Sequence, residues 1–214
     1  MIRLILASQS PARLETLRSA GIEPVVRVSG VDEDAALARL VGDNHGAHPP
    51  APEVALGLAR AKADAVAATI HQHALVLGCD SILELDGEIH GKPTDAVEAV
   101  QRWRRMRGQA GILHSGHWLI DARSADNGGG QGSVGATSST IVHFADLTDD
   151  EIAAYVATGE PLNVAGAFTI DGIGGPFISG IEGDHHAVVG LSLPLLRTLL
   201  GELGLTVMDL WRAT

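Results

Sequence analysis

RLILASQSPAR, residues 3–13, is the stretch that decides how the chain begins to fold. Residues 3–7, of which all but Arg3 are apolar, have the pattern and length of a short buried strand. Two leucines, Leu14 and Leu17, follow at helical spacing, and Gly21 ends that pattern. We therefore expect the chain to open with a strand, a loop and a helix.

The loop between that strand and that helix has the features of an anion site. Ser10 can cap the helix and Pro11 can serve as its first residue. Backbone N–H groups at a helix N-terminus have no partner within the helix, so the segment from Ser8 to Arg13 lies where a phosphate group is favoured. We expect this loop to bind phosphate.

Apolar periodicity and turn residues predict the remaining elements. They are a strand at 24–29, a short helix after the acidic residues 31–34, a flexible loop at about 42–52, a helix at 53–70, a strand at 74–78 that ends at Asp80, a hairpin at 82–90, a helix at 94–107 capped by Thr94, two strands around a flexible loop at 124–139, a helix opened by the capping box 148–151, and a C-terminal helix begun by Ser192. The Asp86-Gly87 turn of the hairpin is expected to bring Lys92 back beside Asp80.

Composition restricts the class of protein. The chain has 214 residues, of which 45% are hydrophobic, and this suits a single domain spanning 1–214. A formal net charge of −11 argues against a nucleic-acid partner, which would need a broad basic face. The lone Cys79 cannot form an internal disulfide, and the N-terminal apolar run is too short for a signal peptide or membrane span. We expect a cytoplasmic protein with no membrane partner.

One familiar motif is excluded by its context. Residues 130–135 fit the spacing G-x-G-x-x-G of a dinucleotide-binding loop. Such a loop has to precede a helix, whereas this one lies in a low-complexity segment between two predicted strands. We do not expect the chain to bind a dinucleotide.

Five charged residues suit phosphate chemistry when they are taken together: Arg13, Glu33, Lys62, Asp80 and Lys92. A nucleoside triphosphate carries about four negative charges, so it needs cations, backbone amides and a divalent metal. The three basic side chains can neutralise phosphate oxygens, and the two carboxylates are hard ligands for Mg²⁺ or Mn²⁺. Either acid can also deprotonate the attacking water. Taken singly, most of them fit a solvated surface charge equally well.

Six short stretches resemble the Maf family in the same order along the chain. They are Leu6–Pro11 with Arg13, Ala59–Ala63, Gly78–Ser81, Gly91–Pro93, Ala165–Phe168, and Gly183-Asp184 followed by Val188–Leu191. The match runs from about residue 4 to about residue 200. Six motifs in order are far more specific than any one of them.

The resemblance implies a fold and a reaction. The fold is α/β, with a mixed, highly twisted sheet in two lobes and a central substrate cleft. The reaction is hydrolysis of a nucleoside triphosphate between its α- and β-phosphates to the monophosphate and pyrophosphate, and the substrate can be a non-standard or modified nucleotide. The family's older name refers to inhibition of septum formation, so the alternative is a non-catalytic, nucleotide-binding regulator of cell division.

The resemblance also implies roles for individual residues. Asp80 matches the catalytic acid, as base or metal ligand, and Glu33 matches a metal-associated acid. The positions expected to bind substrate are Ser8, Ser10, Arg13, Lys62, Ser81 and Lys92. The implied cofactor is a divalent cation, Mg²⁺ or Mn²⁺, and a homodimer is the default assembly.

The chain departs from the family pattern at three places. Ala12 replaces the first arginine of the usual Ser-x-Ser-Pro-Arg-Arg loop, and Asn163-Val164 replaces a usual Asp-Lys pair, so two cations are missing. The usual Tyr-Gly-Ile-Gln stretch is replaced by residues 168–171, which puts the acceptor-only carboxylate of Asp171 in place of an amide. We expect Asp171 to bind substrate and, if it faces the base, to favour a ring that presents donors such as an amino group.

Overall fold

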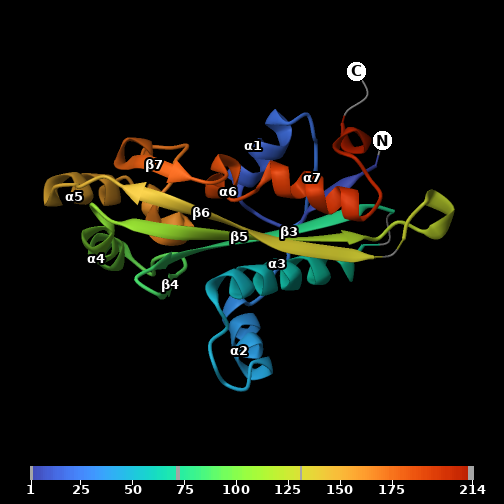
Figure 1. The fold of residues 1–214 in the computed structure, drawn as a ribbon, viewed down its shortest axis with the longest axis horizontal. Coiled ribbons are helices and arrows are strands. Elements are labelled where there is room, and N and C mark those ends of the chain that lie inside the picture. The colour runs from blue at the N-terminus through green and yellow to red at the C-terminus, as the bar shows by residue number, and fades with distance from the viewer. Residues whose placement is uncertain (1, 71–72, 131, 212–214) are drawn as a thin grey trace.

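The computed structural model describes residues 2–70, 73–130 and 132–211, and its arrangement is drawn in Figure 1. The helices and strands follow one another as β1 (Leu4–Leu6), α1 (Pro11–Ser19), β2 (Val25–Val26), α2 (Glu33–Asp43), α3 (Ala51–Ala67), β3 (Leu75–Leu85), β4 (Glu88–His90), α4 (Ala96–Met106), β5 (Ala110–Asp121), β6 (Ser133–Phe144), α5 (Asp149–Ala157), β7 (Ile178–Glu182), α6 (His185–Val189) and α7 (Leu193–Glu202). Within these described ranges, no helix is long and apolar enough to cross a membrane.

One mixed sheet of seven strands runs through the described part of the chain in the order β2-β1-β3-β5-β6-β7, with β4 also paired to β3. β1 is parallel to β2 and to β3, whereas the pairs from β3 through β5 and β6 to β7 are antiparallel. The three long strands β3, β5 and β6 lie along the length of the molecule, with α3 on one face and α1, α6 and α7 on the other (Figure 1). The expected mixed α/β fold is confirmed.

Two hydrophobic clusters lie toward opposite ends of the long strands. One contains Trp103 of α4 packed edge-on against Phe144 and Tyr155, together with side chains of β3, β5 and β6. The other joins β1 and α1 to the C-terminal helix α7 through residues such as Leu6 and Leu199. These clusters correspond to the two expected lobes, and the substrate cleft between them stays a prediction.

Close packing of α3 on the sheet depends on small residues. A Cβ on Gly78 of β3 would lie 2.1 Å from the backbone oxygen of Ala59, and a Cβ on Gly116 of β5 would lie 2.3 Å from that of Ala55. The two alanines are four residues apart, so they lie on the same face of the helix, and this face packs against the sheet. The backbone of α3 therefore approaches the strands more closely than larger side chains would allow.

The helix starts were largely predictable from capping residues. Ser10 caps α1, since its Oγ accepts a hydrogen bond from Arg13 N at 3.4 Å, and Pro11 is the first helical residue. The capping box of Thr148 and the cap at Ser192 are also confirmed. The cap of α4, however, is Asp95 and not Thr94, because Asp95 Oδ1 accepts from Glu98 N at 2.8 Å.

Two predicted loops are shorter than expected. The predicted strand at 24–29 is also reduced to β2, Val25–Val26. In the predicted loop at 42–52, Gly42 and Asp43 still belong to α2. α3 already begins at Ala51, because Pro52 is tolerated in the first turn of a helix. Only residues 44–50 therefore connect the two helices. In the predicted loop at 124–139, Gln131 lies outside the described residues and 133–139 belong to β6.

The small residues of β6 that suggested a loop reflect its packing. A Cβ on Gly135 would lie 2.2 Å from the ring of Trp118 on the neighbouring strand. Thr137 lies under the start of α3, where its Oγ1 donates a hydrogen bond to Pro52 O at 2.8 Å. Larger side chains would clash on that face, so a composition typical of loops occurs in a paired strand.

Candidate active site

Asp80 lies inside β3 and not at its end, which corrects the expectation of a strand that stops there. The pairing of β1 with β3 reaches only Leu77, and β4 pairs with the same edge only from Leu83 onward. Between these points, no strand among the described residues covers that edge of β3. The sheet is therefore open beside Asp80, where the loop from β1 to α1 begins.

Lys62 joins the two candidate acids. Its Nζ lies 2.5 Å from Oδ1 of Asp80 and 2.6 Å from Oε1 of Glu33. Lys62 and Asp80 are buried, with relative exposures of 9% and 7%, whereas the side chain of Glu33 is 54% exposed. The cluster thus runs from the sheet outward toward solvent.

Three local features bring these side chains together. α3 packs tightly at Gly78, two residues before Asp80, and Lys62 is the neighbour of Ala63, which also faces the sheet. Asp32 caps α2 by accepting from Ala35 N at 3.0 Å, which makes Glu33 the first residue of that helix. The cluster is therefore assembled by two helices and one strand.

The environment moves the pKa values of the two acids in opposite directions. Burial raises the pKa of Asp80 above its ordinary value, against the opposing charges of Lys62 and Arg13. Burial would also raise the pKa of Glu33, but its hydrogen bond with Lys62 and the charges of Lys62 and Lys92 outweigh burial and lower it. The pKa of Lys62 is raised, because the two carboxylates outweigh its own burial. Such a separation of two carboxylates is typical of acid/base sites.

The guanidinium of Arg13 is held on several sides by the protein. Its Nε donates to Gly190 O at 2.9 Å, and Nη1 donates to Cys79 O at 2.8 Å and to Ser8 Oγ at 3.1 Å. Nη2 donates to Ser81 Oγ at 3.1 Å. Of the five N–H groups of an arginine, one remains for a ligand. Arg13 thus ties α1 to the uncovered edge of β3 and to the end of α6.

The hydroxyl groups around Arg13 have defined roles. Ser115 donates to Ala187 O at 2.7 Å, so in its 2.8 Å contact with Ser81 it has to be the acceptor and Ser81 the donor. Ser8 accepts from Ser10 N at 3.2 Å and from Arg13, which leaves its own proton free for a ligand. Ser115 was missed by the sequence reasoning, since a serine within a strand carries no signal of this kind.

Lys92 and Asp171 are the outlying members of the predicted set, and both are exposed. Lys92 follows β4, and its charge lowers the pKa of Glu33, so the hairpin brings it toward Glu33. The Asp86–Gly87 turn that returns the chain is confirmed, with φ values of 52° and 76°. Asp171 lies in a loop that Glu160 holds through Thr169 and the backbone of residues 173 and 174.

The donor set of the cluster fits a divalent cation bound together with substrate. No group of three or more His, Cys, Asp or Glu side chains placed to hold a metal occurs in the described ranges. Lys62 contacts Asp80 through Oδ1 and Glu33 through Oε1, so the second oxygen of each acid is left for a ligand. Mg²⁺ is commonly bound by one or two carboxylates with substrate phosphates and water, and this arrangement suits that pattern.

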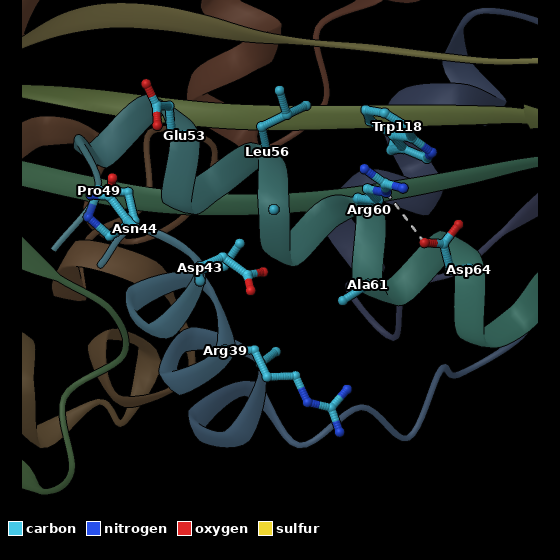
Figure 2. Close-up of a pocket in the computed structure, with 13 residues that line it drawn as sticks. Arg39, Asp43, Asn44, Pro49, Glu53, Leu56, Arg60, Ala61, Asp64 and Trp118 are labelled. Atoms are coloured by element: carbon cyan, nitrogen blue, oxygen red, sulfur yellow. Dashed lines mark hydrogen bonds and ion pairs between the residues drawn. The ribbon is translucent and has the colours of Figure 1, made fainter. Parts of the chain in front are cut away.

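A pocket of about 620 Å³ lies between α2 and α3, away from Asp80. Figure 2 shows Arg60 between Trp118 and Asp64 on one side of this pocket and Arg39 and Asp43 of α2 on the other. Arg60 lies over the ring of Trp118 at 4.9 Å and contacts Asp64 at 3.4 Å. None of the predicted site residues lines it, so this pocket is separate from the cluster around Asp80.

Several known proteins are similar to this chain. The family described as Maf-like protein matches residues 3–203. The chain is 57% identical over 210 residues to a nucleoside triphosphate pyrophosphatase of Streptomyces coelicolor, covering 98% of this chain and 94% of that protein. It is 56% identical over 214 residues to a nucleoside triphosphate pyrophosphatase of Salinispora tropica, covering 98% and 88%. A solved nucleoside-triphosphatase / dITP/XTP pyrophosphatase from Mycobacterium abscessus is similar at 13% identity and a TM-score of 0.37, covering 95% and 96%, which is too distant to support a conclusion.

Proposed function

The chain belongs to the family of Maf-like proteins and is a nucleoside triphosphate pyrophosphatase, and we propose that its chemistry takes place where Lys62 joins Asp80 to Glu33. The enzyme hydrolyses a nucleoside triphosphate to the monophosphate and pyrophosphate. The observation that carries the proposed location is the buried lysine between two acids, at the open edge of β3 and close to the N-terminus of α1.

Asp80 is the proposed general base. Its raised pKa, caused by burial, makes its carboxylate a better proton acceptor than an ordinary aspartate. The hydrogen bond from Lys62 at 2.5 Å fixes Oδ1, so Oδ2 is the oxygen that takes the proton of the attacking water. Lys62 is paired with both carboxylates, which raise its pKa and keep it protonated, so its charge also attracts the α-phosphate.

The phosphate chain is proposed to lie across the loop between β1 and α1. Ser8 can donate its hydroxyl proton. In the first turn of α1, Pro11 has no N–H and Arg13 N is bonded to Ser10, so Ala12 N is the N–H group left for a ligand among the described residues of that turn. Arg13 contributes one N–H and its charge, and Lys92, whose charge acts on Glu33, contributes a further cation. These groups stabilise the charge that develops on the leaving pyrophosphate.

Mg²⁺ or Mn²⁺ is the proposed cofactor, which Glu33 would hold directly and Asp80 through the attacking water that its Oδ2 deprotonates. The lowered pKa of Glu33 keeps that acid ionised at neutral pH, as a metal ligand requires. When bound, the cation would neutralise charge on the phosphate oxygens that it contacts. Because Ala12 replaces an arginine expected in this loop, more of the phosphate charge has to be met by Lys62, Lys92 and the cation.

Asp171 is proposed to contribute to recognition of the base. It is exposed, and the 3₁₀ turn Ala165–Ala167 that precedes its loop is bound to the Lys92 loop, since Gly166 N donates to Gly91 O at 3.0 Å. A carboxylate only accepts hydrogen bonds, so a base that presents an amino group is favoured. A comparison of amino-bearing with carbonyl-bearing nucleotides tests this, and a clear preference for UTP or dTTP would refute it.

The proposed location is tested by pyrophosphate release from a panel of standard and modified nucleotides with Mg²⁺ or Mn²⁺. Lys62→Met should lower kcat/KM by at least about 100-fold on every substrate that the native enzyme turns over. Arg60→Met removes an arginine from an exposed position on the same helix and serves as the control. Equal turnover by the two variants would refute the location.

A further inference from the structure

The loop that carries Lys92 is anchored through its backbone. The carbonyl oxygen of Gly91 accepts a hydrogen bond from Gly166 N at 3.0 Å and another from Nη1 of Arg102 at 2.5 Å. Pro93 is buried, whereas Lys92 between them is exposed and makes no hydrogen bond or ion pair within the described residues. The direction in which Lys92 points is therefore set by its two neighbours.

Arg102 of α4 also controls the other end of this loop, through Glu98. Its Nη2 lies 2.5 Å from Oε1 of Glu98, and Oε2 of Glu98 accepts from Thr94 N and from Thr94 Oγ1, both at 2.7 Å. The arginine and its acid thus hold the residue before Lys92 and the residue two positions after it. Both anchors lie on one turn of α4, so the loop is bound to a rigid element.

Burying an arginine costs free energy, and the buried Arg102 donates hydrogen bonds to two groups that lie in different directions. Arg102 is only 5% exposed, and its single carboxylate partner has a side chain that is 38% exposed. Burying a charge is unfavourable unless its hydrogen bonds are made, and an apolar residue of similar volume often packs equally well. The planar fork of an arginine can donate to a carbonyl and to a carboxylate at the same time, in two fixed directions.

We propose that Arg102 is a positioning residue of the enzyme, which holds the loop from Gly91 to Thr94 so that the ammonium group of Lys92 meets the pyrophosphate part of the substrate. This inference rests on the proposed function, because it needs Lys92 as a phosphate ligand. The charge of Lys92 already reaches Glu33, so a small displacement of the loop moves it relative to the cluster. A misplacement by about 1 Å can cost up to about 100-fold in rate.

A double-mutant cycle tests the proposal. The variants are Lys92→Met, Arg102→Met and the two combined, with Arg102→Lys as a conservative replacement and Arg104→Met as the matched control. Arg104 is on the same helix, and its contact with Asp149 is exposed. Glu98→Ala, at a half-exposed position, provides a second way to release Thr94 if Arg102→Met folds poorly. For each variant, kcat and KM are measured with a nucleoside triphosphate and Mg²⁺, and thermal unfolding is recorded.

We expect Lys92→Met to lower kcat/KM about 100-fold and Arg102→Met or Glu98→Ala about tenfold. In the Lys92→Met background, Arg102→Met should have no further effect on turnover, and Arg102→Lys should recover part of the loss. A merely structural arginine would instead lower activity equally in both backgrounds, and this result would overturn the inference. Full activity of Arg102→Met and Glu98→Ala with a defective Lys92→Met would also overturn it. Full activity of Lys92→Met would refute the proposed role of Lys92 itself.

Discussion

Nζ of Lys62 lies 2.5 Å from Oδ1 of Asp80, and both side chains are buried where the edge of β3 is open. A buried charge that loses its partner is strongly destabilising, by roughly 3–5 kcal/mol. The ion pair of Lys62 with Asp80 therefore keeps an ionised acid inside the protein. It also fixes Oδ1, so that Oδ2 is the oxygen available to the substrate.

Lys62→Met should change the pH dependence of the reaction. Without the lysine, burial acts on Asp80 with less opposition, so the pKa of this acid rises further. The base then loses its proton only at higher pH, and the acid limb of kcat/KM should move to higher pH. A pH profile of residual turnover measures this, and an acid limb that stays in place or moves downward would contradict the account.

Glu33→Gln should raise the concentration of Mg²⁺ needed for half-maximal activity by about tenfold, because the acid proposed to hold the cation directly is lost. Saturating metal should restore most of the rate, since Asp80 and Lys62 remain. Titration of activity with Mg²⁺ measures this change. Asp34→Asn, at the next position of α2, is the control, and the same half-saturating concentration in both variants would count against Glu33 as a ligand.

Gly78→Ala should destabilise the protein and lower its activity together. The new Cβ would lie 2.1 Å from Ala59 O, so α3 has to move away from β3 and take Lys62 with it. Overpacking of this kind costs about 1–3 kcal/mol. Gly201→Ala in α7, where no atom lies within 4 Å of the new Cβ, should instead be neutral or stabilise by up to about 1 kcal/mol. Denaturant unfolding compares the two, and equal stabilities would contradict the close approach of α3.

His117 should make the free energy of unfolding depend on pH. Burial lowers its pKa from 6.5 to about 4, while Nε2 accepts a hydrogen bond from Ser192 N at 2.8 Å. The unfolded histidine gains a proton below pH 6.5, whereas the folded one stays neutral until about pH 4. This contribution to stability is thus complete above pH 6.5 and is lost as the pH falls to 4, by at most about 3 kcal/mol.

His117→Gln should remove that part of the pH dependence, because glutamine does not titrate. Denaturant unfolding of the native protein and the variant measures the difference, at several pH values from about one unit above the unfolded pKa of 6.5 down to about pH 4.5, near the lower end of the window. Parallel curves for the two proteins would show that His117 does not titrate as its burial implies.

Local signals made the start of the fold predictable. The capping residue Ser10, the following proline and the apolar residues of β1 act over a few positions, so the sequence alone indicated that unit. The end of β3 was misjudged, because a carboxylate after an apolar run is typical of a strand end, and only the pairing of β3 with β5 shows that the strand continues through Asp80. Likewise, the small residues of β6 are explained only by its packing against Trp118 and α3.

The candidate site was predictable mainly from family resemblance. No periodicity indicated that Lys62, in the middle of a helix, would meet an acid 18 positions later, because that contact depends on how closely α3 packs at Gly78. The hydrogen bonds that occupy most of Arg13 join residues as far apart as Gly190, and the anchoring of Lys92 by Arg102 is a tertiary contact between a loop and a helix. Such contacts leave no local pattern in the sequence.

Asp80→Asn tests the central claim most directly. The amide keeps the size of the side chain but cannot accept the proton of the attacking water, so release of pyrophosphate should fall by at least about 1000-fold at saturating substrate and metal. Asp64→Asn, on the exposed face of α3, should retain the native rate. A folded Asp80→Asn protein that releases pyrophosphate as fast as the Asp64→Asn control would contradict the account.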